Sequence, residues 1–293
     1  MTIRGHACLS IVMMSLVIRP AQADLVESDI FLAGEHYSEW QYDGSQAKCE
    51  LRHEIPQFGI SRFLRIAGQD LTFRINSFQP TPRVVEGLIR ETTPSWKDKQ
   101  SDPITLPVIL KQGLLPVDLR RKEAAWLLAS LADGQMPGFD FLDWDDTRKK
   151  VHVRLSPVNF QKAYRQFKLC LNQMSNKGFD DYRETEVNFE LDKHVLRSKE
   201  QATLEELADY ILADRSIKRI MIDGHADDQG THPYNRKLSQ RRADSVEAFL
   251  TKAGVSAGQI ETHAYGETKL KINSRTESAR EANRRAEIRL IRD

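Results

Sequence analysis

Two residues of opposite charge, Asp227 and Arg242, stand where the chain alternates strand and helix signals. Asp227 follows an apolar strand candidate, in a loop where a polar side chain can point away from a sheet edge. Arg242 lies four residues after Leu238 and four before Val246, on or beside the apolar stripe of a helix expected at 233–252. A charge on that face needs a partner, because charged side chains are rarely buried alone. Two roles are open: a salt bridge that ties the loop to the helix, or a pair of charges that holds a ligand carrying both signs.

The same stretch contains other reactive side chains. His225, Asp227, Asp228 and His232 fall within eight residues, but their spacing matches no standard zinc or calcium pattern. No serine stands in a nucleophile-elbow pattern, and an aspartate near a histidine is too common to indicate a catalytic pair. We therefore expect a binding protein with no catalytic residue, no metal and no cofactor.

The second half of the chain supplies the elements that must position these residues. Ser198 and Gln201 have capping-box spacing at the start of one helix, and Gly254 ends the helix that carries Arg242. The first of these helices has a clean apolar stripe made of Leu204, Leu207, Ala208, Ile211 and Leu212. Strands are expected at residues 186–191, 218–223, 260–265 and 286–291.

The first half reads mainly as short strands. Strand candidates lie at 50–55, 63–73 (with Gly68-Gln69-Asp70 as a turn signal), 84–89, 104–110 and 151–155. Helices are expected at 121–132 and 160–174. Residues 179–184 are polar enough for a linker. We expect an α+β protein with a β-rich domain containing two helices at 24–176 and a second domain at 177–293.

The N-terminus has the parts of a secretory signal peptide at 1–23. Arg4 gives a positive start, residues 7–18 form an apolar run, and Ala21-Gln22-Ala23 offers small residues for cleavage. The apolar run is shorter than the about 20 residues that a membrane-spanning helix needs. Cys8 stands at the start of this run, not after it, so no lipidated cysteine is expected. We expect a secreted mature protein that does not span a membrane.

Cys49 and Cys170 remain after cleavage, 121 residues apart. In an oxidising compartment an even number of cysteines favours a disulfide, so we predict a Cys49–Cys170 bond. Two buried free thiols are the alternative.

The charge balance gives little support for a nucleic-acid partner. Removing Arg4 and Arg19 takes the 43 basic residues to 41, against 42 acidic ones, and the two signs are interleaved. Nucleic-acid binding usually needs a concentrated basic face.

The C-terminal pattern resembles the OmpA-like peptidoglycan-binding domain. The matching residues are Gly224-His225-Ala226-Asp227, Gly230, Tyr234-Asn235, Leu238-Ser239, Arg242-Ala243, Tyr265-Gly266-Glu267, Asn273 and Asn283-Arg284-Arg285. Two positions depart from the family pattern: Ala226, where threonine is common, and Ala279, where glycine is common. The resemblance implies an α/β sandwich, a mixed sheet with helices on one face.

The resemblance also implies a ligand, the diaminopimelate of the peptidoglycan stem peptide. The side chain of diaminopimelate ends in an ammonium and a carboxylate on one carbon. Asp227 and Arg242 would hold its two ends, Asn235 and Leu238 would line the pocket, and Arg285 would lie near it. A guanidinium fork suits a carboxylate because it can donate two parallel hydrogen bonds.

The layout of the whole chain resembles the MotY family, the T-ring proteins of sodium-driven polar flagella. Tyr37-Ser38-Glu39-Trp40, the two retained cysteines and the total length carry this resemblance. It implies a non-catalytic periplasmic protein of the flagellar motor that binds the partner MotX and the flagellar basal body. Its C-terminal domain would fix the assembly, with its stator complex, to peptidoglycan. The alternative is a periplasmic envelope-integrity protein that tethers another partner with the same anchor.

Overall fold

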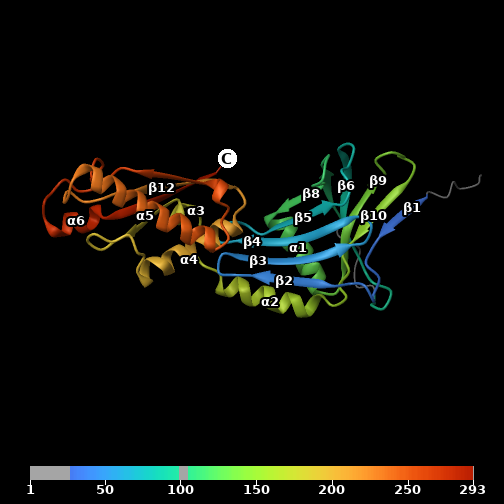
Figure 1. Cartoon of the computed structure of the whole chain (residues 1–293). Coiled ribbons are helices and arrows are strands. Elements are labelled where there is room, and N and C mark those ends of the chain that lie inside the picture. Colours follow the sequence, from blue (N-terminus) through green and yellow to red (C-terminus); the bar gives the residue numbers. More distant parts are fainter. Residues whose placement is uncertain (1–26, 99–104, 293) are drawn as a thin grey trace, which may run out of the picture.

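The computed structural model describes residues 27–98 and 105–292, so the signal peptide expected at 1–23 lies outside the described residues. Figure 1 shows an elongated molecule with the first half of the chain at one end and the second half at the other. Within the described ranges, none of the helices is both long and apolar enough to cross a bilayer.

The first sheet of the N-terminal half is an antiparallel meander with one later strand at its edge. Its order is β2 (Trp40–Gly44), β3 (Lys48–Ile55), β4 (Gly59–Ile66), β5 (Thr72–Ser77) and β8 (Val117–Arg120). The run expected at 63–73 is a hairpin, in which Phe63 pairs with Phe73 across the turn. Gly68 has a φ of +71° in this turn, a conformation that glycine adopts without strain.

The second sheet of the N-terminal half also has five strands. Its order is β1 (Ser28–Phe31), β10 (Lys150–Arg154), β9 (Met136–Leu142), β6 (Val85–Thr92) and β7 (Thr105–Leu110). β1 pairs with β10 in parallel, and the other neighbours are antiparallel. β6, β7 and β10 confirm three strand predictions to within a few residues, although Ile104 is not among the described residues.

Two helices complete this half. α1 (Arg121–Ala132) has the predicted bounds, and α2 (Phe160–Gln173) ends one residue before the predicted end. One apolar cluster joins both sheets and both helices, and its fully buried aromatic side chains are Phe63, Phe73, Phe139, Phe160 and Phe167.

The predicted disulfide is confirmed. Cys49 on β3 is bonded to Cys170 on α2, with the two Cα atoms 5.9 Å apart. Both residues are buried, so the bond fixes α2 against the first sheet.

The C-terminal half is the expected mixed sheet with helices on one face. The sheet order is β11 (Glu184–Asn188), β14 (Arg285–Arg292), β12 (Ile217–Gly224) and β13 (Ile260–Ala264), with only the β12–β13 pair parallel. α4 (Ser198–Ala213) and α5 (His232–Lys252) pack on Ile220, Ile222 and Ile288. The remaining short helices are α3 (Phe179–Tyr182), η1 (Ala257–Gln259) and α6 (Glu277–Asn283).

Two local expectations are wrong. The capping box at Ser198 does not form, because Arg197 occupies the N-cap position of α4 and makes no side-chain cap bond. The Gln201 amide donates to Leu196 O instead. The segment expected as a linker at 179–184 contains α3, because Tyr182 is buried and stacks on Tyr210 with ring centroids 4.8 Å apart.

Two turns of the first sheet contact the C-terminal half. Ala47 and Ala67 belong to the apolar cluster of that half. Gln69 Nε2 donates to Asp214 Oδ2 at 2.9 Å, and Ala47 N donates to Asp209 Oδ2 at 3.2 Å. The two halves are therefore joined by packing and by hydrogen bonds, as well as by the chain between them.

Candidate functional site

Asp227 lies in the loop that follows β12, and its side chain is buried. One carboxylate oxygen, Oδ1, accepts from the backbone N–H of Gln229 at 3.1 Å and closes the loop locally. The other, Oδ2, accepts from Arg284 Nη1 at 3.0 Å. The loop thus holds a negative charge in a fixed position at the end of the sheet.

Arg242 lies on α5 and is fully buried, as its position on the apolar stripe predicted. Its guanidinium donates to three backbone carbonyls: Nε to Lys193 O at 2.9 Å, Nη1 to His225 O at 2.7 Å and Nη2 to Glu190 O at 3.3 Å. The guanidinium also lies 5.3 Å from the ring centroid of Phe189. Burial lowers the pKa of Arg242 to about 10, while attraction to Asp227 opposes this effect. The group is therefore a cation near neutral pH.

The neighbouring Arg241 is exposed. It is thus a natural control for Arg242, since both lie on the same turn of α5.

Asn235 and Leu238 join Asp227 and Arg242. Asn235 is buried and donates from Nδ2 to Asp227 O at 3.3 Å, and Leu238 is buried on the same helix. Within the described residues no ion pair links Asp227 directly to Arg242. The loop and the helix are joined through backbone carbonyls instead, so the simple salt bridge considered from the sequence does not form.

The arginine that contacts Asp227 is Arg284, which the sequence analysis did not single out. Arg284 follows α6 and also pairs with Glu277, with Nη2 and Oε1 2.9 Å apart. Arg285, the next residue, starts β14 and contacts Glu287 at 2.7 Å and Lys269 O at 3.4 Å. Of these two neighbouring arginines, Arg284 is therefore the one that pairs with the carboxylate of Asp227, while Arg285 pairs with Glu287.

His225 lies on the same side of the sheet as Arg285. It is buried and stacks on Tyr265, with ring centroids 5.4 Å apart. Burial, followed by repulsion from Arg285, lowers the pKa of His225 to about 4. The imidazole is therefore neutral at pH 7, and its role in the loop is packing.

The acidic and histidine side chains of this loop face different partners. Asp228 Oδ1 accepts from Arg280 Nε at 2.7 Å, and His232 Nδ1 lies 2.9 Å from Glu267 Oε1. Among residues 27–98 and 105–292, no three histidine, cysteine or acidic side chains are arranged to hold a metal ion.

Close backbone packing sets the position of the loop. A Cβ at Gly224 would lie 2.0 Å from Ser239 O, so only glycine lets β12 approach α5 this closely. Ser239 Oγ accepts from Gly266 N at 2.9 Å, and Ala226 N donates to Gly266 O at 2.8 Å. Ala226, one of the two departures from the family pattern, is buried in this packing.

Comparisons with known proteins divide the chain in the same order. A model of the MotY N-terminal domain matches residues 31–175, and a model of the OmpA family matches residues 188–284. The chain is 26% identical over 286 residues to the sodium-type flagellar protein MotY of Vibrio parahaemolyticus, which covers 96% of each chain.

Shorter relatives match the C-terminal half. The chain is 35% identical over 146 residues to the peptidoglycan-associated lipoprotein of Buchnera aphidicola, covering 48% of this chain and 84% of the relative. The crystal structure of the peptidoglycan-associated lipoprotein from Burkholderia pseudomallei aligns with 31% identity and a TM-score of 0.35, over 36% of this chain and 89% of that one. The chain therefore belongs to the OmpA family through its C-terminal domain, which follows a MotY N-terminal domain.

Proposed function

We propose that this protein is a non-catalytic periplasmic component of the flagellar motor, and that its C-terminal domain anchors the motor to peptidoglycan. The observation that carries the proposal is the convergence of Asp227, Asn235 and Arg242 in one buried, hydrogen-bonded cluster at the end of the sheet. The cluster holds charges of both signs, the chemistry that the zwitterionic end of diaminopimelate requires.

Asp227 would receive the ammonium of diaminopimelate. Its Oδ2 already accepts from Arg284, and its Oδ1 from one backbone N–H. A carboxylate has about four lone-pair positions, so it can accept further hydrogen bonds without losing these two.

Arg242 would receive the carboxylate of diaminopimelate. A guanidinium has five N–H donors, and three of those of Arg242 are bonded to backbone carbonyls. Two of these carbonyls belong to Glu190 and Lys193, in the segment between β11 and α4. Since Arg242 is fully buried, ligand entry would require this segment to move away from the guanidinium.

The motor assignment is supported by the similarity to the Vibrio MotY protein over 96% of both chains. The first domain, at 24–176, would bind MotX and the flagellar basal body as part of a T ring. The second, at 177–293, would grip peptidoglycan so that the stator complex is held against torque. The alternative of an envelope-integrity protein shares this anchor, but the match of residues 31–175 to the MotY N-terminal domain favours the flagellar assignment.

Titration with two soluble muropeptides tests the ligand. One contains diaminopimelate in the stem peptide, and the other contains lysine, which lacks the side-chain carboxylate. We expect the diaminopimelate form to bind at least tenfold more tightly, because only it can occupy both Asp227 and Arg242. Equal affinity for the two would contradict the assignment of Arg242 to a ligand carboxylate.

A swimming assay tests the motor assignment. In a strain that lacks the native protein, the wild-type chain should restore swimming and Arg242→Lys should not, although both should accumulate equally. Normal swimming without any copy of the protein would contradict a role in the motor.

A further inference from the structure

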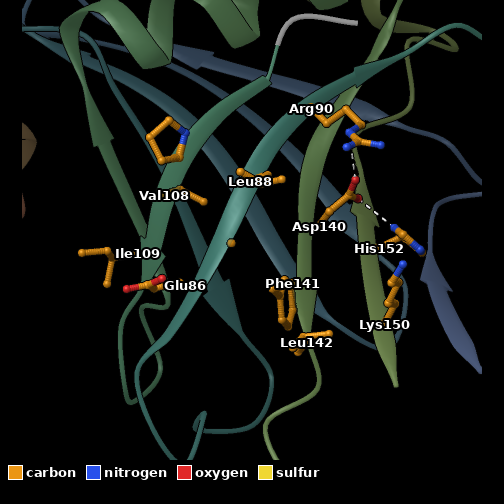
Figure 2. Close-up of a pocket in the computed structure, with 12 residues that line it drawn as sticks. Glu86, Leu88, Arg90, Val108, Ile109, Asp140, Phe141, Leu142, Lys150 and His152 are labelled. Carbon is orange, nitrogen blue, oxygen red and sulfur yellow. Dashed lines mark hydrogen bonds and ion pairs between the residues drawn. The ribbon is translucent and has the colours of Figure 1, made fainter. Parts of the chain in front are cut away.

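The sheet formed by β1, β10, β9, β6 and β7 has one face in the core and one face outside it. Ile89, Phe139 and Val153 point from its inner face into the apolar cluster. The outer face holds an open groove of about 780 Å³, drawn in Figure 2. The site proposed for peptidoglycan lies in the other half of the chain, so this groove is a separate surface.

Apolar side chains line one side of the groove. Leu88 on β6 lies opposite Pro107 on β7, and Ile109 on β7 continues this surface, while Leu142 on β9 lies across the groove beside Lys150. The exposed fractions of Leu88, Ile109 and Leu142 are 38%, 62% and 45%. Single exposed apolar residues are normal, but a cluster of them beside charged groups is typical of an interaction site.

Charged side chains line the other side, around Asp140 on β9. This carboxylate accepts from His152 Nδ1 at 2.8 Å and from Arg154 Nη2 at 2.5 Å, and it lies 3.3 Å from Arg90 Nε (Figure 2). Lys150 is exposed, and its side-chain ammonium has no hydrogen-bond or ion-pair partner in the described part of the chain. Asp140 is thus fully engaged, while Lys150 and the partly exposed Arg90 present positive charge to the groove.

We propose that this groove binds an extended segment of a partner protein that carries apolar side chains and a carboxylate. The apolar side chains pack on Leu88 and Ile109, and the carboxylate pairs with Lys150 and Arg90. Charge complementarity supports this occupant, because a carboxylate there satisfies an unpaired ammonium and breaks no existing ion pair. Glu86, which has no ion-pair partner in the described residues, lies on the apolar side and gives the bound segment a direction.

Pairing of the partner segment with the outer edge of β7, the last strand of this sheet, is a less suitable mode of binding. Pro107 lies in that edge strand and has no backbone N–H to donate to an added strand. The occupant therefore lies across the face of the sheet, where its side chains meet those of β6 and β9.

The choice of probe rests on the proposed motor function: purified MotX is titrated into the full mature protein. Leu88→Glu and Lys150→Glu should each weaken MotX binding at least tenfold. Leu169→Glu is the matched control, since Leu169 is 60% exposed on α2, away from the groove, and its variant should bind MotX like the wild type. Rising salt should weaken wild-type binding more than it weakens binding by Lys150→Glu.

Sedimentation with peptidoglycan sacculi is measured on the same samples. All three variants should still sediment, which separates failure of the groove from failure of the anchor. The proposal would be overturned if the wild type did not bind MotX. It would also be overturned if Leu88→Glu and Lys150→Glu bound MotX as tightly as the control variant Leu169→Glu. Self-association of the wild type that Leu88→Glu abolishes would place a second copy in the groove and would also overturn it.

Discussion

Asp227 Oδ2 and Arg284 Nη1 form a buried ion pair, 3.0 Å apart, between the loop after β12 and the end of α6. This pair fixes the carboxylate that we assign to the ammonium of the ligand. It is also a structural element, because Arg284 is a buried cation whose remaining ion-pair partner, Glu277, is largely exposed.

Asp227→Ala should therefore destabilise the C-terminal domain as well as remove a ligand contact. Breaking a buried ion pair by removing one partner typically costs about 3–5 kcal/mol, because it leaves the other charge uncompensated. Urea unfolding followed by circular dichroism measures this loss. Asp227→Asn keeps an oxygen that can accept from Arg284, so its loss should be smaller. If Asp227→Ala lowered the free energy of unfolding no more than Asp227→Asn does, the ion pair between Asp227 and Arg284 would contribute little to stability.

His225 should make the stability of the C-terminal domain depend on pH. Its pKa falls from an ordinary 6.5 to about 4 on folding, so the unfolded chain binds the proton more tightly. The free energy of unfolding is highest above pH 6.5, the pKa of His225 in the unfolded chain. It falls as the pH drops from there toward about 4, the pKa in the folded protein. The loss should reach about 2 kcal/mol from about pH 7.5 to about pH 5. The free energy of unfolding is measured at both pH values for the wild type and for His225→Gln. The loss between the two pH values should be about 2 kcal/mol smaller in the variant. An equal loss in the two proteins would show that His225 does not cause the pH dependence.

Loss of the Cys49–Cys170 bond should destabilise the N-terminal half selectively. The bond joins residues 121 apart, and the chain-entropy model gives up to about 4–5 kcal/mol for a loop of that size. All four tryptophans (Trp40, Trp96, Trp126 and Trp144) lie in this half, so their fluorescence reports its unfolding. The double substitution Cys49→Ala and Cys170→Ala should move the tryptophan transition to lower urea. Coincident transitions with and without the bond would show that the bond adds no stability.

Gly68→Ala should weaken the junction between the two halves. An added Cβ at Gly68 would lie 2.5 Å from Gly178 Cα, so the new methyl group would clash with the backbone of Gly178. Gly113 is the matched control, because it also has a positive φ but has nothing within 4 Å of the added Cβ. Gly68→Ala should lower the free energy of unfolding by about 1–3 kcal/mol more than Gly113→Ala. Equal losses for the two variants would mean that the contact between Gly68 and Gly178 is loose enough to accept a methyl group.

The helices were the most predictable elements, because local signals define both their faces and their ends. The alanine- and leucine-rich run of α1 stops before Gly134, and α5 stops before Gly254, which has a φ of +106°. Strand β9 was missed because it contains Pro137 and Gly138, both of which indicate turns. It forms a central strand because a Cβ at Gly138 would lie 1.9 Å from Val153 O, so glycine is needed for the pairing with β10.

In the candidate site, too, some features could be predicted from the sequence and others could not. The helical position of Arg242 was enough to predict its burial, since it depends only on spacing along α5. The choice between Arg284 and Arg285 depends on where α6 ends and β14 begins, which the sequence does not define to a single residue. The coverage of Arg242 by carbonyls of Glu190 and Lys193 is a tertiary contact across about 50 residues, beyond the reach of any local pattern.

Sedimentation of the protein from residue 24 to 293 with purified sacculi shows whether the C-terminal domain binds peptidoglycan through Arg242. Arg242→Ala removes the guanidinium, Arg242→Lys keeps the charge without the fork, and Arg241→Ala is the control on the adjacent exposed arginine. Circular dichroism of each variant establishes that it is folded. We predict that the wild type and Arg241→Ala sediment with sacculi and that both Arg242 variants stay in solution. Sedimentation of a folded Arg242→Ala to the same extent as the wild type would contradict it.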